Sequence, residues 1–148
     1  MTNGAQSGTG GTYAGDITVQ ETWETLKKDP DAILVDVRTN AEWAYVGLPD
    51  LSPLGKKVYP ISWVLFPDMS RNTNFIDDVA ASQPNRDAPI FFLCRSGVRS
   101  IAAAEAATQA GYKNSYNVLD GFEGSPDQDG HRGRLGGWKA ADLNWKQG

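Results

Sequence analysis

The chain contains one cysteine, Cys94, at a position where a thiol could act as a nucleophile. The apolar run Ile90 to Leu93 precedes it and predicts a buried strand, and an alanine-rich segment that predicts a helix begins at Arg99. Cys94 would therefore lie at the carboxyl end of a strand and next to the N-terminus of a helix. Backbone N–H groups and the positive end of the helix dipole stabilise a thiolate in such a place.

The loop after Cys94 reads Arg-Ser-Gly-Val-Arg and has the features of an anion-binding site. Gly97 permits a turn in which several N–H groups face inward. Arg95 and Arg99 add positive charge on either side of that turn. The same field would attract an anionic substrate and favour the thiolate of Cys94. The alternative is a structural cysteine, because free cysteine is among the most buried residue types.

The length and the charge of the chain limit the classes of protein to which it can belong. We expect one domain over residues 16–148, after a flexible tail over residues 1–15 that is rich in Gly, Ser, Thr and Asn. The net charge of −4 argues against a nucleic-acid-binding protein. No stretch approaches the roughly 20 apolar residues of a membrane span, and the N-terminus lacks the features of a signal peptide. We therefore expect no membrane partner and a cytoplasmic location.

The single cysteine also excludes several kinds of site. An internal disulfide, a Cys-x-x-Cys redox pair and a zinc site made of several cysteines each need at least two thiols. The one histidine, His131, stands in the polar, glycine-rich stretch 129–133. Of a Cys94–His131 dyad and a histidine in a surface loop, we favour the surface loop. We expect neither a metal nor a cofactor.

Apolar runs alternate with helical patterns along the chain. Thr18 and Glu21 form a capping-box pattern before the first helix, and Gly111 is placed to end the alanine-rich helix. The alternation predicts an α/β domain with a mostly parallel sheet, in which sites form beyond the carboxyl ends of the strands. Asp36 and Cys94 both lie at such ends. The expected helices cover residues 19–28, 41–46, 72–81, 99–110 and 137–143, the expected strands 32–37, 58–65, 90–93 and 115–119, and the expected loops 47–60 and 123–137.

Three motifs resemble the single-domain rhodanese-like sulfurtransferases. Cys94 to Ser100 resembles the active-site loop of that family, and Asp36 to Trp43 resembles its signature Asp-x-Arg-x-x-x-Glu followed by an aromatic residue. Val118 to Phe122 resembles the end of its last strand. The resemblance runs from about residue 16 to residue 145. It implies a three-layer α/β domain, with a mostly parallel five-stranded sheet between helices on both faces.

One segment departs from the pattern of this family. The signature usually continues with Gly-His-Ile, whereas this chain has Gly47-Leu48-Pro49-Asp50 followed by a long loop. We expect the segment 47–66, with Trp63 and Phe66 near its end, to reshape the mouth of the pocket.

The resemblance implies a two-step transfer of sulfur. The Cys94 thiolate attacks the outer sulfur of a small anionic donor such as thiosulfate, sulfite leaves, and a Cys94 persulfide remains. Cyanide, a thiol or a protein partner then accepts the sulfur. Because the chain has no second cysteine, the acceptor must be external.

The resemblance also implies roles for the residues around the sulfur. The backbone N–H groups of residues 95–99 would stabilise the charged sulfur, and Arg95 would point outward and receive the donor. Arg99 could turn inward against Asp36 or Glu42 and brace the loop, or it could contact the substrate. The active-site loop then comprises Arg95, Ser96, Gly97, Val98 and Arg99, and the residues that support it are Asp36, Arg38, Glu42 and Ser100.

Two other functions stay open for the same fold. Cysteine-based phosphatases, and the arsenate reductases of this fold, use a longer Cys-x5-Arg loop around a tetrahedral oxyanion, whereas here Arg99 follows Cys94 with the spacing Cys-x4-Arg. The residue before Cys94 is Leu93, not the histidine of tyrosine phosphatases. Rhodanese-like domains that lack the cysteine act as binding or regulatory modules, and Cys94 argues against that function. We therefore expect a sulfurtransferase.

Overall fold

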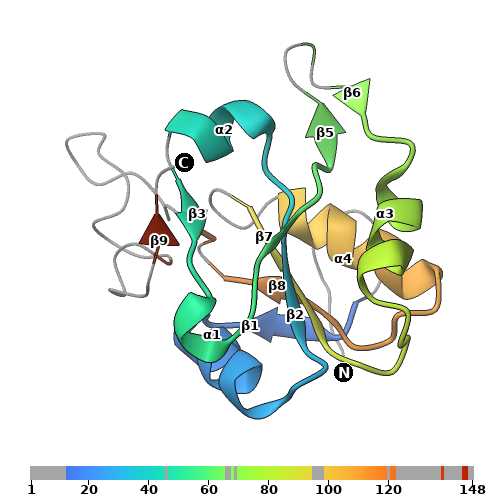
Figure 1. Ribbon diagram of the computed structural model, residues 1–148. Helices are drawn as coiled ribbons and strands as arrows, with labels where there is room; N and C mark the ends of the chain where they lie inside the picture. Colours follow the sequence, from blue (N-terminus) through green and yellow to red (C-terminus); the bar gives the residue numbers. More distant parts are fainter. Residues whose placement is uncertain are drawn as a thin grey trace.

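Five parallel strands form the central sheet of the domain (Figure 1). The computed structural model describes residues 13–45, 47–65, 68, 70–94, 99–119, 121–122, 138 and 145–146. The strands occur in the order β1-β8-β7-β2-β4 across the sheet, and each neighbouring pair is parallel. Their bounds are β1 Gly15–Ile17, β2 Ile33–Asp36, β4 Tyr59–Pro60, β7 Ile90–Leu93 and β8 Ser115–Val118.

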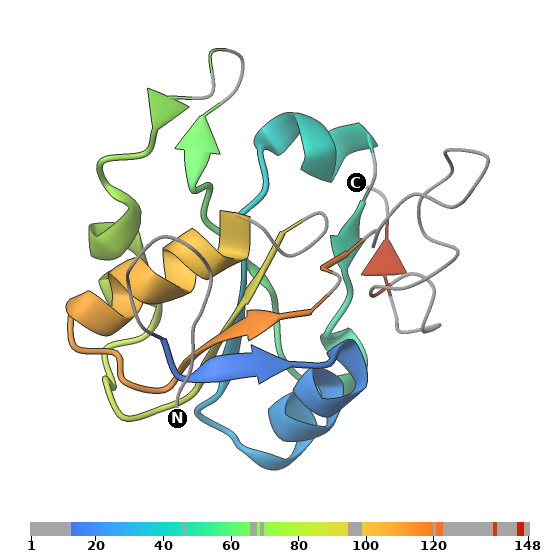
Figure 2. The same cartoon turned by 180° about the vertical axis from the view of Figure 1, so that it is seen from behind.

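Helices cover both faces of this sheet (Figures 1 and 2). Helices α3 and α4 contact each other and pack on one face, whereas α1 packs on the other. The expected three-layer α/β architecture with a mostly parallel five-stranded sheet is therefore confirmed. The helices of the described part of the chain are α1 Val19–Lys28, α2 Asn40–Tyr45, the 3-10 helix η1 Ser52–Leu54, α3 Phe75–Ser82 and α4 Arg99–Gln109.

The alternation of side chains along the strands divides the core into two parts. Val35 and Phe92 belong to the part beneath α3 and α4, whereas Leu34 and Phe91 belong to the part beneath α1. Successive residues of a strand point to opposite faces of the sheet. A strand that is apolar at every position therefore fills both parts, and all four residues of β7 are buried.

Most of the predicted elements are confirmed, with small shifts at their ends. Helix α1 and strand β7 have the predicted bounds. The capping box is also confirmed: Thr18 Oγ1 accepts a hydrogen bond from the N–H of Glu21, whose carboxylate accepts one from the N–H of Thr18. Gly111 adopts a φ of 106° just after α4, a conformation that glycine tolerates and that ends the helix.

The prediction of one continuous strand over residues 58–65 is wrong. The structure divides it into β4, at the edge of the central sheet, and β5 Val64–Leu65, which pairs antiparallel with β6 Ser70–Arg71. Pro60 has no N–H to donate, and proline in a sheet is largely confined to edge strands. Ile61 and Trp63 still donate to the carbonyl oxygens of Asp36 and Val37, so the chain leaves the edge of the central sheet only after Trp63 and then forms a separate hairpin.

Within the described part of the chain, three further strands, β1, β3 and β9, were not predicted. The expected loop 47–60 contains β3 Leu48–Pro49, which pairs antiparallel with β9 Trp145–Lys146. Strand β1 begins at Gly15, one residue before the expected start of the domain, and pairs with β8. Strands of two or three residues are too short for a hydrophobic period to reveal them.

Two helix predictions had different outcomes. Helix α3 begins at Phe75, later than the expected start at residue 72, because Asn72 Oδ1 accepts a hydrogen bond from the N–H of Asn74 and forms a turn there.

The predicted helix 137–143 lies outside the described residues, apart from Trp138. Trp138 is fully buried and stacks edge-on against Trp23 of α1.

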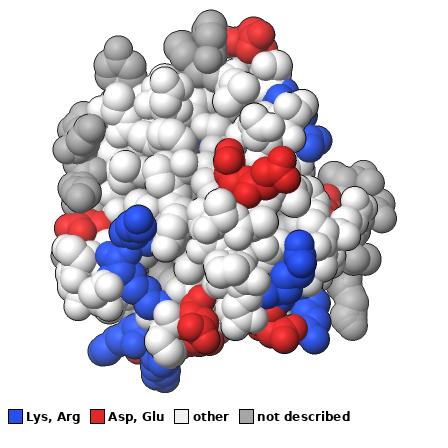
Figure 3. Space-filling view, turned by 45° about the vertical axis from the view of Figure 1, so that its right-hand side comes forward, with Lys and Arg blue, Asp and Glu red and all other residues white. Residues whose placement is uncertain are grey.

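Charged side chains lie in separate groups over the face shown in Figure 3. One group of acidic residues stands apart near the centre of this view, and basic groups lie to its lower left and lower right with further acidic residues near them. Among the described helices, none has the length and apolar character needed to cross a bilayer.

We expect Thr18→Ala to lower the free energy of unfolding by about 1 kcal/mol, because the first turn of α1 loses the acceptor for the N–H of Glu21. Thr18→Ser is the matched control, since it keeps the hydroxyl oxygen. Urea unfolding followed by circular dichroism measures both variants. Equal stability of the two variants would show that the threonine cap contributes nothing.

Candidate active site

Cys94 lies at the carboxyl edge of the sheet, directly after β7. The residue is 1% exposed. Its carbonyl oxygen accepts a hydrogen bond of 2.8 Å from the N–H of Phe122, which joins it to the segment after β8. On the other side, the N–H of Val37 donates to the carbonyl oxygen of Leu93 at 2.8 Å. The segments that follow β2 and β8 therefore hold the end of β7 and the backbone of Cys94.

The thiol lies beside the first turn of α4. Cys94 Sγ is 3.3 Å from Oγ of Ser100, which is fully buried. The Ser100 hydroxyl donates to Oδ1 of Asn117 in β8. Ser100 was expected from the sequence, whereas Asn117 was not. The signal available for Asn117 was its position as a polar residue inside the expected strand 115–119.

Asp36 and Arg38 form a buried ion pair at the carboxyl end of β2. Both side chains are 0% exposed, and Arg38 Nη2 lies 2.6 Å from Asp36 Oδ2. Arg38 Nε also donates to Asp36 Oδ1 at 2.9 Å, so the guanidinium and the carboxylate meet through two parallel hydrogen bonds. Among the described residues, Arg38 Nη1 has no hydrogen-bond partner.

The guanidinium of Arg38 also joins the end of β2 to two distant segments. Its Nη2 donates to the carbonyl oxygen of Gly47 at 2.6 Å. Its Cζ lies 4.3 Å from the centre of the Phe122 ring, a cation–π contact. Phe122 also donates its N–H to the carbonyl oxygen of Cys94. The ion pair is therefore linked through Phe122 to the backbone of Cys94. Asp36, which pairs with Leu93 in the sheet, and Arg38 lie next to the carboxyl end of β7. Their support of the loop 95–98 stays a prediction.

Arg99, the first residue of α4, pairs with Glu42 of α2. Nη1 and Nη2 of Arg99 lie 2.8 and 2.9 Å from the two carboxylate oxygens of Glu42. The two side chains are 22% and 19% exposed. Of the two partners considered from the sequence, Asp36 and Glu42, it is Glu42 that holds this guanidinium. Arg99 directly follows the segment 95–98, which lies outside the described residues.

Glu42 has a second set of contacts that fix its carboxylate. It accepts hydrogen bonds from the N–H and the hydroxyl of Thr39, and Thr39 Oγ1 accepts one from the N–H of Glu42. Burial alone raises the pKa of Glu42, but the hydrogen bonds from Arg99 and Thr39 and the charges of Arg99 and Arg38 lower it overall. Burial alone lowers the pKa of Arg99, but Glu42 raises it overall. Each partner thus stabilises the charged form of the other.

The remaining predicted site residues have mixed outcomes. Arg95 to Val98 and His131 lie outside the described residues, so their roles stay predictions. Trp63, expected at the mouth of the pocket, belongs to the core instead, where its ring meets that of Phe75 at 5.1 Å. The described residues contain no group of three or more side chains suited to holding a metal ion.

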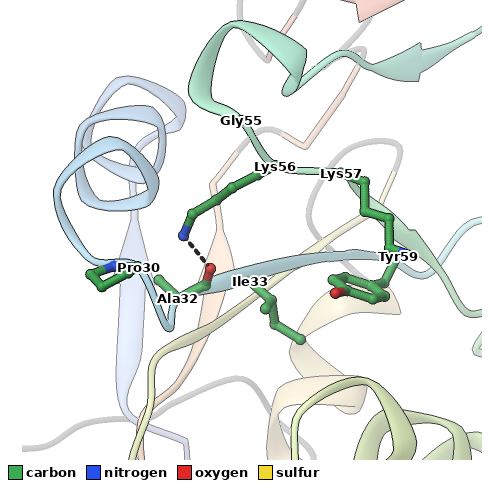
Figure 4. Close-up of a pocket in the computed structure, with 7 residues that line it drawn as sticks. All are labelled: Pro30, Ala32, Ile33, Gly55, Lys56, Lys57 and Tyr59. Carbon is green, nitrogen blue, oxygen red and sulfur yellow. Dashed lines mark hydrogen bonds between the residues drawn. The ribbon is translucent and has the colours of Figure 1, made fainter.

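A cavity of about 490 Å³ lies at the other end of the strands (Figure 4). Lys56 reaches across it, and its Nζ donates to the carbonyl oxygens of Ala32 and Asp29, both at 2.6 Å. Ile33 in its wall pairs with Ile90, the first residue of β7, so about 13 Å of strand separate that register position from Cys94. The cavity is therefore separate from the Cys94 site. It is lined by Pro30, Ala32, Ile33, Gly55, Lys56, Lys57 and Tyr59.

Comparison with known proteins agrees with this fold. A family model described as the STR4 middle domain matches residues 14–148. The crystal structure of Rv0390 from M. tuberculosis is 52% identical with a TM-score of 0.84, and the match covers 93% of this chain and 100% of that one. Uncharacterized protein RC0915 of Rickettsia conorii is 44% identical over 124 residues, which are 84% of this chain and 90% of the relative. Thiosulfate sulfurtransferase GlpE of Haemophilus influenzae is 29% identical over 109 residues, 74% of this chain and 85% of the relative.

The parallel sheet, the order of the motifs and these matches define a rhodanese-like sulfurtransferase domain. This chain belongs to that family, and within it the model of the STR4 middle domain matches nearly its whole length.

We expect Glu42→Gln to lower the free energy of unfolding near neutral pH by about 1 kcal/mol, because a neutral amide loses the charge-assisted contact with Arg99. The folded-state pKa of Glu42 is lowered, so its carboxylate contributes stability above the ordinary value of 4.5. That contribution is lost as the pH falls through the folded-state pKa, where wild type and variant should converge.

Urea unfolding near neutral pH and near pH 3 tests this expectation. Glu24→Gln, at an exposed position of α1, is the control for removal of a surface carboxylate. If the Glu42 variant is destabilised equally at both pH values, the ion pair is not the cause.

Proposed function

We propose that the chain is a sulfurtransferase that carries a sulfane sulfur on Cys94. The position of Cys94 carries this proposal: it is the one cysteine, and it stands between the end of β7 and the start of α4. Parallel α/β sheets form their sites at this edge. The name of the relative GlpE, a thiosulfate sulfurtransferase, supports the same reaction for this chain.

Each half of the proposed reaction moves one sulfur atom. The Cys94 thiolate attacks the outer sulfur of thiosulfate, the S–S bond of the donor breaks, and sulfite leaves with the bonding electron pair. A thiophile such as cyanide or a thiolate then attacks the outer sulfur of the persulfide, and Cys94 leaves as the thiolate. A reducing compartment such as the cytoplasm would keep the thiol free for this chemistry.

We propose distinct roles for the two arginines near Cys94. Arg95 receives the anionic donor, and the backbone N–H groups of residues 95–99 stabilise the charged sulfur. Arg99 braces the loop instead of contacting the substrate. Its two-pronged contact with Glu42 supports this role, because that contact occupies both terminal nitrogens of the guanidinium.

The contact between Arg99 and Glu42 also weakens the case for a phosphatase or an arsenate reductase. An arginine that binds a tetrahedral oxyanion must turn its planar fork toward the substrate. Arg99 instead directs its fork to a carboxylate of α2, and its Cys-x4-Arg spacing is one residue short. A binding module without catalysis is the third possibility, and the experiments below separate all three.

Incubation with thiosulfate should add one sulfur atom to the peptide that contains Cys94, because the first half-reaction leaves a persulfide. Mass spectrometry of the digested protein measures the added mass of about 32 Da, and a reducing thiol should remove it. Cys94→Ser is the control, which should neither gain the mass nor form thiocyanate from thiosulfate and cyanide. Absence of the added sulfur on the wild-type peptide would contradict the proposal.

The rival functions predict other outcomes in the same preparation. A higher kcat/KM for p-nitrophenyl phosphate hydrolysis than for sulfur transfer would identify a phosphatase. Reduction of arsenate with a thiol reductant would identify an arsenate reductase. A folded protein with none of these activities and no persulfide would be a binding module.

Arg95→Ala should raise the KM for thiosulfate roughly fivefold with a smaller effect on kcat, because the lost charge assists capture of the donor. Steady-state thiocyanate formation measures both constants. Arg86→Ala is the matched control, since Arg86 is exposed and precedes the opposite end of β7. An unchanged KM in the Arg95 variant would remove this residue from donor binding.

A further inference from the structure

A chain of polar side chains connects Cys94 to the edge of the sheet. Ser100 Oγ lies 3.3 Å from the sulfur and donates to Asn117 Oδ1. Asn117 Nδ2 donates to Asp16 Oδ1 at 3.0 Å, and the hydroxyl of Tyr13 donates to the same oxygen at 2.8 Å. Three of these residues are at most 1% exposed, namely Cys94, Ser100 and Asn117. The sheet aligns the chain, because Asp16 of β1 and Asn117 of β8 are directly paired.

The carboxylate of Asp16 fixes the direction of every hydrogen in this chain. A carboxylate can only accept, so the amide nitrogen of Asn117 must face Asp16 and its oxygen must face Ser100. That oxygen can also only accept, so the Ser100 hydroxyl must donate to it. The single hydrogen of Ser100 therefore points away from Cys94.

Tyr13 strengthens this arrangement from the other end. Burial, together with the hydrogen bond to Asp16 and the negative charges of Asp16 and Glu105, raises the pKa of Tyr13 to about 12. The phenol thus keeps its hydrogen and donates it to Asp16. Asp16 remains an acceptor for both neighbours, which keeps the amide of Asn117 in its observed orientation.

The direction of the Ser100 hydroxyl matters for the charge of the sulfur. A neutral thiol can donate its own hydrogen to Ser100 Oγ, whereas a thiolate or a persulfide anion needs a donor. Ser100 can supply that hydrogen only by turning away from Asn117, which leaves a buried amide oxygen without its hydrogen bond. We propose that Asn117, held by Asp16, is a positioning residue that directs the Ser100 hydroxyl and thereby sets the fraction of Cys94 present as thiolate.

Other charged groups also act on the sulfur, and a test must leave them unchanged. Among the described residues, Arg99 of α4 interacts electrostatically with Cys94 and pairs with Glu42 of α2. The buried Asp36–Arg38 pair lies at the end of β2, and Glu105 of α4 acts on Tyr13. The inference concerns the nucleophile of the proposed sulfur transfer, but thiol ionisation can be measured without any transfer. The two proposals can therefore fail separately.

The test is a titration of Cys94 by the ultraviolet absorbance of the thiolate, with Cys94→Ser subtracted as the blank. The single cysteine makes this signal specific. Asn117→Leu keeps a similar volume but cannot accept a hydrogen bond, so Ser100 is free to donate to the sulfur. We expect the midpoint to fall by about one pH unit, which is about a tenfold rise in the ratio of thiolate to thiol.

The same titration in the Ser100→Ala variant separates the effect of the Ser100 hydroxyl from other effects of the Asn117 substitution. In Ser100→Ala the hydroxyl is absent, so adding Asn117→Leu should leave the midpoint of that variant unchanged. An unchanged midpoint in Asn117→Leu alone would overturn the proposal. A shift of equal size with and without Ser100 would also overturn it, because the effect would then bypass the hydroxyl.

Asn117→Val is the second variant if the leucine substitution prevents folding, which thermal unfolding would reveal. Valine suits a strand and cannot accept a hydrogen bond from Ser100, so the midpoint should again fall. In the Ser100→Ala background, the same substitution should leave the midpoint unchanged. Absence of the fall, or an equal fall in both backgrounds, would contradict the inference.

Discussion

A buried carboxylate needs a cation beside it, and Asp36 meets Arg38 with both side chains fully buried. That guanidinium also binds the carbonyl of Gly47 and lies over the ring of Phe122. Phe122 in turn holds the carbonyl of Cys94, so β2, the chain after α2, and the segments after β7 and β8 meet around one charge. Breaking such a pair leaves an uncompensated buried charge at a cost of about 3–5 kcal/mol. The geometry beneath the nucleophile therefore depends on this interaction.

A second ion pair works nearer the surface and has a different consequence. Arg99 and Glu42 join the start of α4 to α2. Because this pair is partly exposed, solvent weakens its electrostatic contribution, and its main effect is to fix the direction of the guanidinium. The buried Asp36–Arg38 pair supports the carboxyl edge of the sheet. The partly exposed Arg99–Glu42 pair holds the guanidinium of Arg99 against α2. The proposed sulfur chemistry relies on this division, since it leaves Arg95 to meet the donor.

Particular elements show how far the sequence could predict this structure. The run from Ile90 to Leu93 predicted β7 with its observed bounds, because a strand covered on both faces must be apolar at every position. The Thr18 and Glu21 pattern predicted the start of α1, because a capping box is a local arrangement of four residues. The pairing of β3 with β9 joins segments almost a hundred residues apart, through strands of two residues each. Such a contact leaves no periodic pattern, so only the folded chain reveals it.

The sequence by itself determined the fold class, the motifs and the one residue able to act as a thiol nucleophile, because these depend on residue type and on spacing along the chain. Only the tertiary structure decided that Arg99 pairs with Glu42 and not with Asp36, because both carboxylates were candidates at the level of sequence. It also decided that Asn117 lies between Ser100 and β1. The reason is that the directions of buried hydrogen bonds depend on which strands become neighbours, and the order β1-β8-β7 is a property of the assembled sheet.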